Sequence, residues 1–233
     1  MKEAVSAILS FYEDVQSRLK QEYTWNIPVL EGFSSVPLSG YEANVELKKY
    51  LNKEWKSASI EKKHELAKFV VAKWGGVRSN KIETLNKYVL QADLPQPQTP
   101  LKGVASYSKI FAIVAPENYA IYDARVAACL NATQFLGNVG QGLTFNYVSG
   151  RNNIIGHAIK KQGFVFHPSF KTKTLRALGW ESIAANDTYQ SYLTLLKKCS
   201  SALSEIPLYE LEMCLFAFAE EQCNKALAKI ASE

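Results

Sequence analysis

The sequence LKGVASYSKIFAIVAPENYAIYDARVAAC, residues 101–129, contains the pattern that decides the fold. Lys102-Gly103 predicts a tight turn, and the apolar run behind it predicts a short helix that breaks at Pro116. A second helix is expected to begin at Asp123, because an aspartate in front of an apolar run is a common N-cap. The stretch therefore predicts a hairpin and two helices, with a carboxylate at the N-terminus of the second helix.

Helical patterns also dominate the rest of the chain, and strand signals are few, so the predicted class is all-α. The predicted helices cover about residues 2–20, 42–56, 60–73, 80–91, 123–137, 153–162, 169–179 and 187–203, with a last one from Pro207 onward. The segment 93–100, DLPQPQTP, contains three prolines and cannot be helical. We therefore expect one all-α domain, 1–233, whose helical lobe (1–92) and hairpin lobe (101–233) are joined near 93–100.

The composition is that of a globular protein, with 47% hydrophobic and 21% charged residues among 233. No apolar run approaches the ~20 residues of a membrane span, and the N-terminus lacks a signal-peptide pattern. The sequence thus predicts a cytoplasmic protein without membrane contact. The four cysteines form no CxxC pair and the histidines lack metal-site spacing, so buried thiols are expected, with neither metal nor cofactor.

Positive charge is concentrated in one part of the chain. The basic segment, Ala124–Trp180, contains seven Lys or Arg residues and no Asp or Glu, and aromatic residues are interleaved with them. Cations for phosphates and flat rings for bases predict a DNA-binding surface. The alternative is a solvated basic face with core aromatics. The candidate DNA contacts are Arg125, Arg151, Asn152, Lys160, Lys161, Lys171 and Lys173, and the candidate base-pocket rings are Phe145 and Tyr147.

The central stretch resembles a known family. LKGVAS resembles the hairpin of helix-hairpin-helix DNA glycosylases, whose pattern is Leu, any residue, Gly, Val or Ile, Gly. Leu101, Gly103 and Val104 match it, and Ala105 replaces the second glycine. Residues 108–126 are similar to the archaeal-type 8-oxoguanine DNA glycosylases in the spacing of a Ser, an apolar helix, a loop and an Asp.

The resemblance implies a two-lobed helical fold and base excision from DNA. Separately, we expect a monomer. Asp123 stands at the position of the family's catalytic aspartate, which would stabilise the sugar cation or orient the nucleophile. Backbone N–H groups at Gly103, Ala105 and Ser106 would bind a DNA phosphate. We accordingly expect Asp123 to face a groove whose far wall is cationic.

The sequence departs from the family at its catalytic lysine. Members that cleave the DNA strand form a Schiff base through a lysine early in the second hairpin helix. In the ungapped register that position falls on Ala105, flanked by Lys102 and Lys109. A nearby lysine can replace it, or water can serve as the nucleophile. The alternative is a non-enzymatic nucleic-acid-binding module in which Asp123 is only an N-cap, and a weaker one is a domain that binds an acidic protein.

Overall fold

The computed structural model describes residues 1–232, and its composition of 62% helix and 4% strand confirms the all-α prediction. The helices are α1 (Lys2–Val15), η1 (Gln16–Arg18), α2 (Leu19–Glu22), α3 (Gly40–Ser57), α4 (Ile60–Lys68), η2 (Phe69–Trp74), α5 (Ile82–Ala92), α6 (Val104–Val114), α7 (Ala124–Leu136), η3 (Phe164–Phe166), η4 (Pro168–Phe170), α8 (Thr172–Ala177), η5 (Ala185–Asp187), α9 (Thr188–Ala202), α10 (Leu208–Ala217) and α11 (Ala219–Ser232). The strands are β1 (Leu143–Thr144), β2 (Arg151–Asn152), β3 (Gly156–His157) and β4 (Glu181–Ser182). β1 pairs parallel with β4, and β2 pairs antiparallel with β3.

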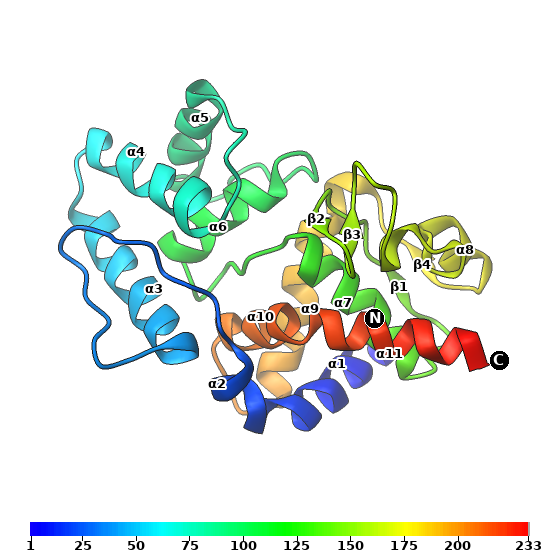
Figure 1. Ribbon diagram of the computed structural model, residues 1–233. Coiled ribbons are helices and arrows are strands. Elements are labelled where there is room, and N and C mark those ends of the chain that lie inside the picture. Colours follow the sequence, from blue (N-terminus) through cyan, green and yellow to red (C-terminus); the bar gives the residue numbers. More distant parts are fainter. Residues whose placement is uncertain (233) are drawn as a thin grey trace.

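The helices pack in two groups (Figure 1). The α3–α6 bundle contains α3, α4, η2, α5 and α6, and the α7–α11 bundle contains α7, α9, α10 and α11 together with α1. The expected boundary at 93–100 is therefore misplaced. Helix α6 follows those residues yet packs against α3, α5 and η2, whereas α1 crosses to pack against α7 and α9. The chain passes between the bundles at residues 23–39 and again at 115–123.

Helices α6 and α7 form the centre of the molecule. Most side chains of both are buried, as is typical of helices with apolar residues on all sides. The extended link between them is fixed by side chains: Ser108 Oγ accepts a hydrogen bond from the Tyr122 amide (3.1 Å), and Tyr189 and Tyr192 donate to the carbonyls of residues 120 and 121. The link therefore delivers Asp123 to a defined position between the bundles.

Several local predictions are confirmed and others are wrong. Ser59 caps α4 by accepting from the Lys62 amide, and the helical run that follows ends at Gly75 as predicted. The prediction of a helix at 153–162 is wrong, because these residues belong to the β2–β3 hairpin and its turns. Asn152 Oδ1 accepts hydrogen bonds from the amides of Ile154 and Ile155, and these bonds stabilise a turn instead of a helix. The last predicted helix is divided into α10 and α11 at Phe218.

The chain's four cysteines are all buried and unpaired, consistent with their use as small core residues. Among residues 1–232, no helix has both the length and the apolar character that crossing a membrane requires.

Candidate active site

Asp123 caps α7 and faces a cavity at the same time. Its Oδ1 accepts hydrogen bonds from the amides of Arg125 (2.9 Å) and Val126 (3.2 Å). Its Oδ2 lies 3.9 Å from Lys109 Nζ, and the side chain is 18% exposed. The two roles considered for this residue are thus compatible, because the cap occupies one carboxylate oxygen and leaves the other directed at the cavity.

Lys109 projects from α6 into the same cavity and is 6% exposed. Its Nζ donates a 2.7 Å hydrogen bond to the carbonyl of Ala105, one helical turn earlier. Burial lowers the pKa of Lys109 below its ordinary value, although the Asp123 and Glu212 carboxylates raise that pKa in part. The ion pair at 3.9 Å is too long for a hydrogen bond, so desolvation prevails. The neutral amine, which is the nucleophilic form, is more populated than in an exposed lysine.

The cavity lies where the two bundles meet and measures about 40 Å³. It is lined by Tyr23, Trp25, Trp74, Gly75, Lys109, Ile121, Asp123, Glu212 and Phe216. Aromatic rings form much of its wall, and they contact one another. Trp25 Nε1 donates a hydrogen bond to the carbonyl of Trp74 (2.9 Å), and the rings of Trp25 and Phe216 pack edge to face with their centroids 5.2 Å apart. The cavity has room for only a few water molecules.

A second buried ion pair borders the cavity. Lys48 Nζ of α3 lies 2.6 Å from Glu212 Oε2 of α10, and the two side chains are 5% and 2% exposed. Burial raises the pKa of Glu212, and the Lys48 ammonium opposes that rise. Sequence reasoning missed this pair. Its signal was a charge on an apolar helix face on each side. Lys48 lies three residues from both Val45 and Leu51, Glu212 lies between Leu208 and Leu215 at helical spacing, and all four of these apolar residues are buried.

Asn44 holds the ring of Trp74 and the backbone of Trp25 in place. This buried side chain donates to the carbonyls of Trp25 (2.8 Å) and Gly40 (2.8 Å), and its Oδ1 accepts from Trp74 Nε1 (2.9 Å). Its full set of partners makes it a rigid connection between the residue 23–39 segment and the end of η2.

The expected base-pocket rings are elsewhere. Phe145 has no exposed surface and lies in the core, so it cannot contact a base, and the prediction for it is wrong. Tyr147 is half-buried, donates to the carbonyl of Phe170 (2.6 Å) and does not line the cavity. The rings at the cavity are instead those of Tyr23, Trp25, Trp74 and Phe216, which lie far from Tyr147 in sequence.

The hairpin has the predicted turn, with Gly103 in the left-handed region at φ +86°. Lys102 is exposed and does not line the cavity, so of the two flanking lysines only Lys109 lies at Asp123. The amide of Ser106 donates to the Gly103 carbonyl (2.9 Å), which corrects its assignment as a phosphate donor. The phosphate contacts of Gly103 and Ala105 stay predictions.

The basic segment divides into paired and unpaired residues. Arg125 lies 2.6 Å from Glu220 and over the Phe216 ring (5.0 Å), and Asn152 also donates to Glu220 (2.8 Å). The basic segment itself contains no acidic residue, but Glu220 of α11 lies close to it in the folded protein. Within residues 1–232 no carboxylate pairs with the exposed remainder, which comprises Arg151, Lys160, Lys161, Lys171, Lys173 and Arg176.

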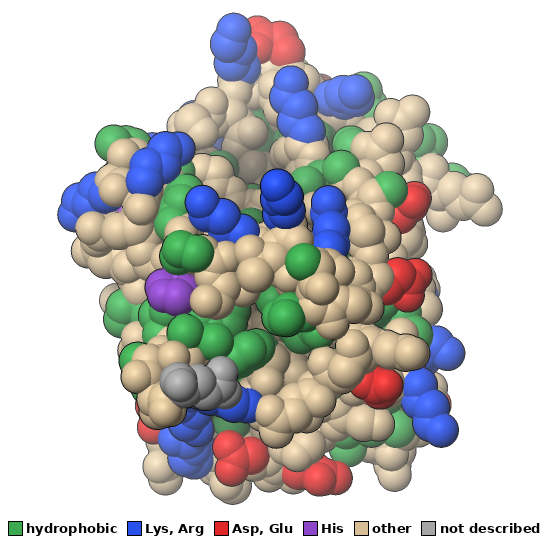
Figure 2. All heavy atoms as spheres, turned by 90° about the vertical axis from the view of Figure 1, so that its right-hand side faces the viewer, with side chains coloured by type: hydrophobic (Ala, Val, Ile, Leu, Met, Phe, Trp, Pro, Cys, Tyr) green, Lys and Arg blue, Asp and Glu red, His purple; other side chains and the backbone are tan. Residues whose placement is uncertain are grey.

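Figure 2 shows Lys and Arg side chains gathered on the upper part of one face, with most Asp and Glu toward its edges. No residue from 124 to 180 lines the Asp123 cavity. The expectation of a cationic far wall built by the basic segment is therefore wrong: the cation that faces Asp123 is Lys109, and the remaining wall is largely aromatic.

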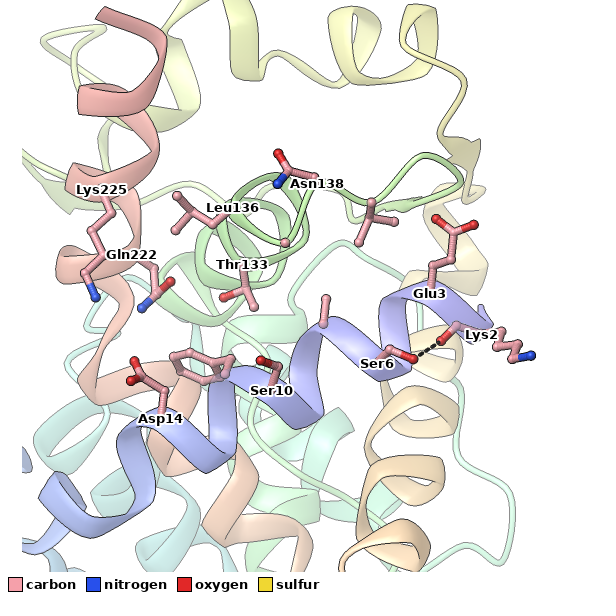
Figure 3. Close-up of a pocket in the computed structure, with 14 residues that line it drawn as sticks. Lys2, Glu3, Ser6, Ser10, Asp14, Thr133, Leu136, Asn138, Gln222 and Lys225 are labelled. Atoms are coloured by element: carbon pink, nitrogen blue, oxygen red, sulfur yellow. Dashed lines mark hydrogen bonds between the residues drawn. The ribbon is translucent and has the colours of Figure 1, made fainter. Parts of the chain in front are cut away.

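A much larger hollow than this cavity lies elsewhere (Figure 3). It is an open groove of about 820 Å³ between α1, the end of α7 and α11, and the side chains that point into it include Ser10, Asp14 and Lys225. It contains no buried charge. We assign the candidate site to the smaller cavity because that cavity brings buried ionisable groups together.

No family model, no curated protein and no solved structure matches this chain.

Proposed function

We propose that this protein is a DNA glycosylase that excises a damaged or modified base and uses Lys109 as its nucleophile. The observation that supports this most is the position of the Lys109 amine, which lies between the Ala105 carbonyl and Asp123. Lys109 lies one helical turn beyond Ala105, and its side chain bends back so that Nζ bonds the Ala105 carbonyl and faces Asp123. The amine thus lies beside Ala105, the residue on which the lysine of the resembled family falls in the ungapped register.

The proposed reaction needs a neutral amine and a nearby carboxylate. Lys109 Nζ attacks C1′ of the flipped nucleotide, and the C1′–N bond to the base breaks, so that the base leaves with that electron pair and gains a proton. The attacking nitrogen loses a proton to Asp123, which also stabilises positive charge on the sugar. Breakage of the C1′–O4′ bond, with a proton taken up at O4′, then leaves a protonated imine on Lys109.

A base can enter only if the cavity opens, because its closed volume is about 40 Å³. Trp25 is the wall residue suited to move: it belongs to the irregular segment 23–39, and it is 36% exposed. In the open form the indole would stack on the base, which must leave the duplex before the chemistry can occur.

A non-enzymatic DNA-binding module is the second candidate, favoured by the degenerate hairpin in which Ala105 replaces glycine. The burial of Lys109 argues for the enzyme. A buried amine with only one carbonyl partner and a distant carboxylate is costly for stability, and a module that merely binds DNA has no use for it.

The experiment is covalent trapping with sodium borohydride on duplexes that carry 8-oxoguanine or an abasic site. Borohydride reduces an imine to a stable amine, so wild type is expected to give a cross-linked protein–DNA band. Lys109→Met should remove the band, while the matched exposed variant Lys102→Met should retain it. Base release without any cross-link would exclude the lysine as nucleophile, and neither product from either duplex would favour the binding module.

A further inference from the structure

Gly75 lies directly against the stem of Lys109. An ideal Cβ built on Gly75 would be 2.5 Å from Lys109 Cδ and 2.6 Å from Cε, distances that no real side chain tolerates. The glycine has an ordinary backbone conformation, with φ −82° and ψ −6°. The same Cβ would also lie 2.7 Å from the Val70 carbonyl oxygen. The identity of Gly75 is therefore explained by the close approach of the lysine stem and of this carbonyl, and not by a turn that only glycine can adopt.

The π-helix η2 brings Gly75 to this place. Its wider turns make the Gly75 amide bond back five residues to the Val70 carbonyl (2.9 Å), and η2 packs on α6. Single π-helical turns within helices are frequent at functional sites, where they redirect a short stretch of backbone. Here the redirected stretch carries Trp74 and Gly75, both of which line the cavity.

We infer that Gly75 is a positioning residue, which directs the Lys109 side chain back over its own helix so that the amine is held between the Ala105 carbonyl and Asp123. Any larger residue at position 75 would push Cδ and Cε aside and move the amine out of reach of Oδ2. The contact itself is independent of DNA, but its role in catalysis depends on the proposed function.

The glycine next to it supplies a matched control. A Cβ on Gly76 would meet nothing within 4 Å, yet its φ of +70° makes alanine there strained. Gly76→Ala should therefore lower the midpoint of denaturation without moving Lys109. Gly75→Ala should lower that midpoint and also displace the lysine, so the two variants separate a general loss of stability from a specific loss of position.

The first test uses protein alone. We expect NMR titration of the lysine Nζ resonances to show Lys109, assigned by its absence in Lys109→Met, titrating below the exposed lysines in wild type and Gly76→Ala. In Gly75→Ala the Lys109 pKa should rise toward its ordinary value, because the displaced amine regains water. An unchanged Lys109 titration in Gly75→Ala would overturn the inference, whether or not the protein excises bases.

A double-mutant cycle provides the second test and remains informative if Gly75→Ala is poorly folded. In a Lys109→Ala background the obstructing stem is gone, so Gly75→Ala should lower the denaturation midpoint less than it does in wild type. Equal losses in the two backgrounds would show that position 75 and Lys109 do not interact. For activity, we expect Gly75→Ala to reduce the cross-linking rate with little change in DNA affinity, and Gly76→Ala to change neither.

Discussion

The cavity and the basic segment place charge in opposite ways. The charges at the cavity come from four different helices and form two pairs. Lys109 of α6 faces Asp123 at the start of α7, and Lys48 of α3 pairs with Glu212 of α10. All of them except Asp123 are buried. In the basic segment the lysines are close in sequence, exposed and without carboxylate partners among the described residues. Charges in the cavity interact strongly and resist screening by salt, whereas those on the surface act together over a distance and are screened.

This difference assigns the two regions different tasks. A few charges held apart from water can stabilise a reacting sugar, because each interaction is strong and already oriented. Many exposed lysines can only supply affinity for a phosphate backbone, without regard to sequence. Substitutions in the cavity should therefore change rate or stability by large factors, and substitutions on the basic segment should change DNA affinity in small and similar steps.

The largest effect is expected for Asp123→Asn. Base excision should fall by about 10²–10⁴-fold, because the amide cannot take a proton from Lys109 or stabilise a cation. The N-cap should survive, since an asparagine oxygen caps as well as an aspartate. Single-turnover excision and thermal denaturation measure the two properties separately. An unchanged rate would show that Asp123 is a cap alone.

Lys48→Met tests the second buried pair. It leaves Glu212 as an unpaired carboxylate in the interior, so the free energy of unfolding should fall by about 3–5 kcal/mol. The matched variant is Lys20→Met, whose partner Glu42 lies at 2.9 Å but in solvent, and it should cost no more than about 1 kcal/mol. Urea denaturation compares them. Equal losses would contradict the claim that the cavity's electrostatics differ from those of the surface.

Asn44→Ala should have a smaller effect on the same scale. It removes the acceptor for Trp74 Nε1 and the donor to the Trp25 carbonyl, and each buried group left without a partner costs about 1–3 kcal/mol. The exposed Asn118→Ala is the control, measured by the same denaturation. A loss no greater than the control's would mean that the cavity rings are held by packing alone.

The smallest single effects are expected on the basic segment. Replacing Lys160, Lys161, Lys171 or Lys173 by alanine should weaken DNA binding alike for all sequences. For each lysine that contacts a phosphate, the slope of log affinity against log salt should fall by about 0.9. Excision at saturating protein should be unaffected. Fluorescence anisotropy over a salt series measures the slope, and an unaltered slope in the fourfold variant would remove this face from the binding surface.

What the sequence could predict was mostly local. The turn at Gly103, the Ser59 cap and the Asp123 cap each depend on residues within one helical turn, and all three are confirmed. The cavity depends on contacts between residues far apart, such as Lys48 with Glu212 and Trp25 with Phe216. No periodicity reports such contacts, which explains why the rings predicted from the basic segment are not the rings that line the cavity.

Lys109 illustrates the limit most clearly. Because the family's lysine position falls on Ala105, the sequence alone leaves two candidate lysines, Lys102 and Lys109. What distinguishes Lys109 in the structure is that its side chain bends back over α6, whereas Lys102 is exposed. That bend depends on the missing side chain of Gly75, which comes from the far end of η2.

The most direct test of the central claim is to locate the trapped sugar on the protein. After borohydride trapping on an abasic duplex, nuclease and protease digestion followed by mass spectrometry should find the reduced adduct on the peptide that contains Lys109, and on no other lysine. An adduct on Lys102 or on the N-terminal amine, with Lys109 unmodified, would contradict the account.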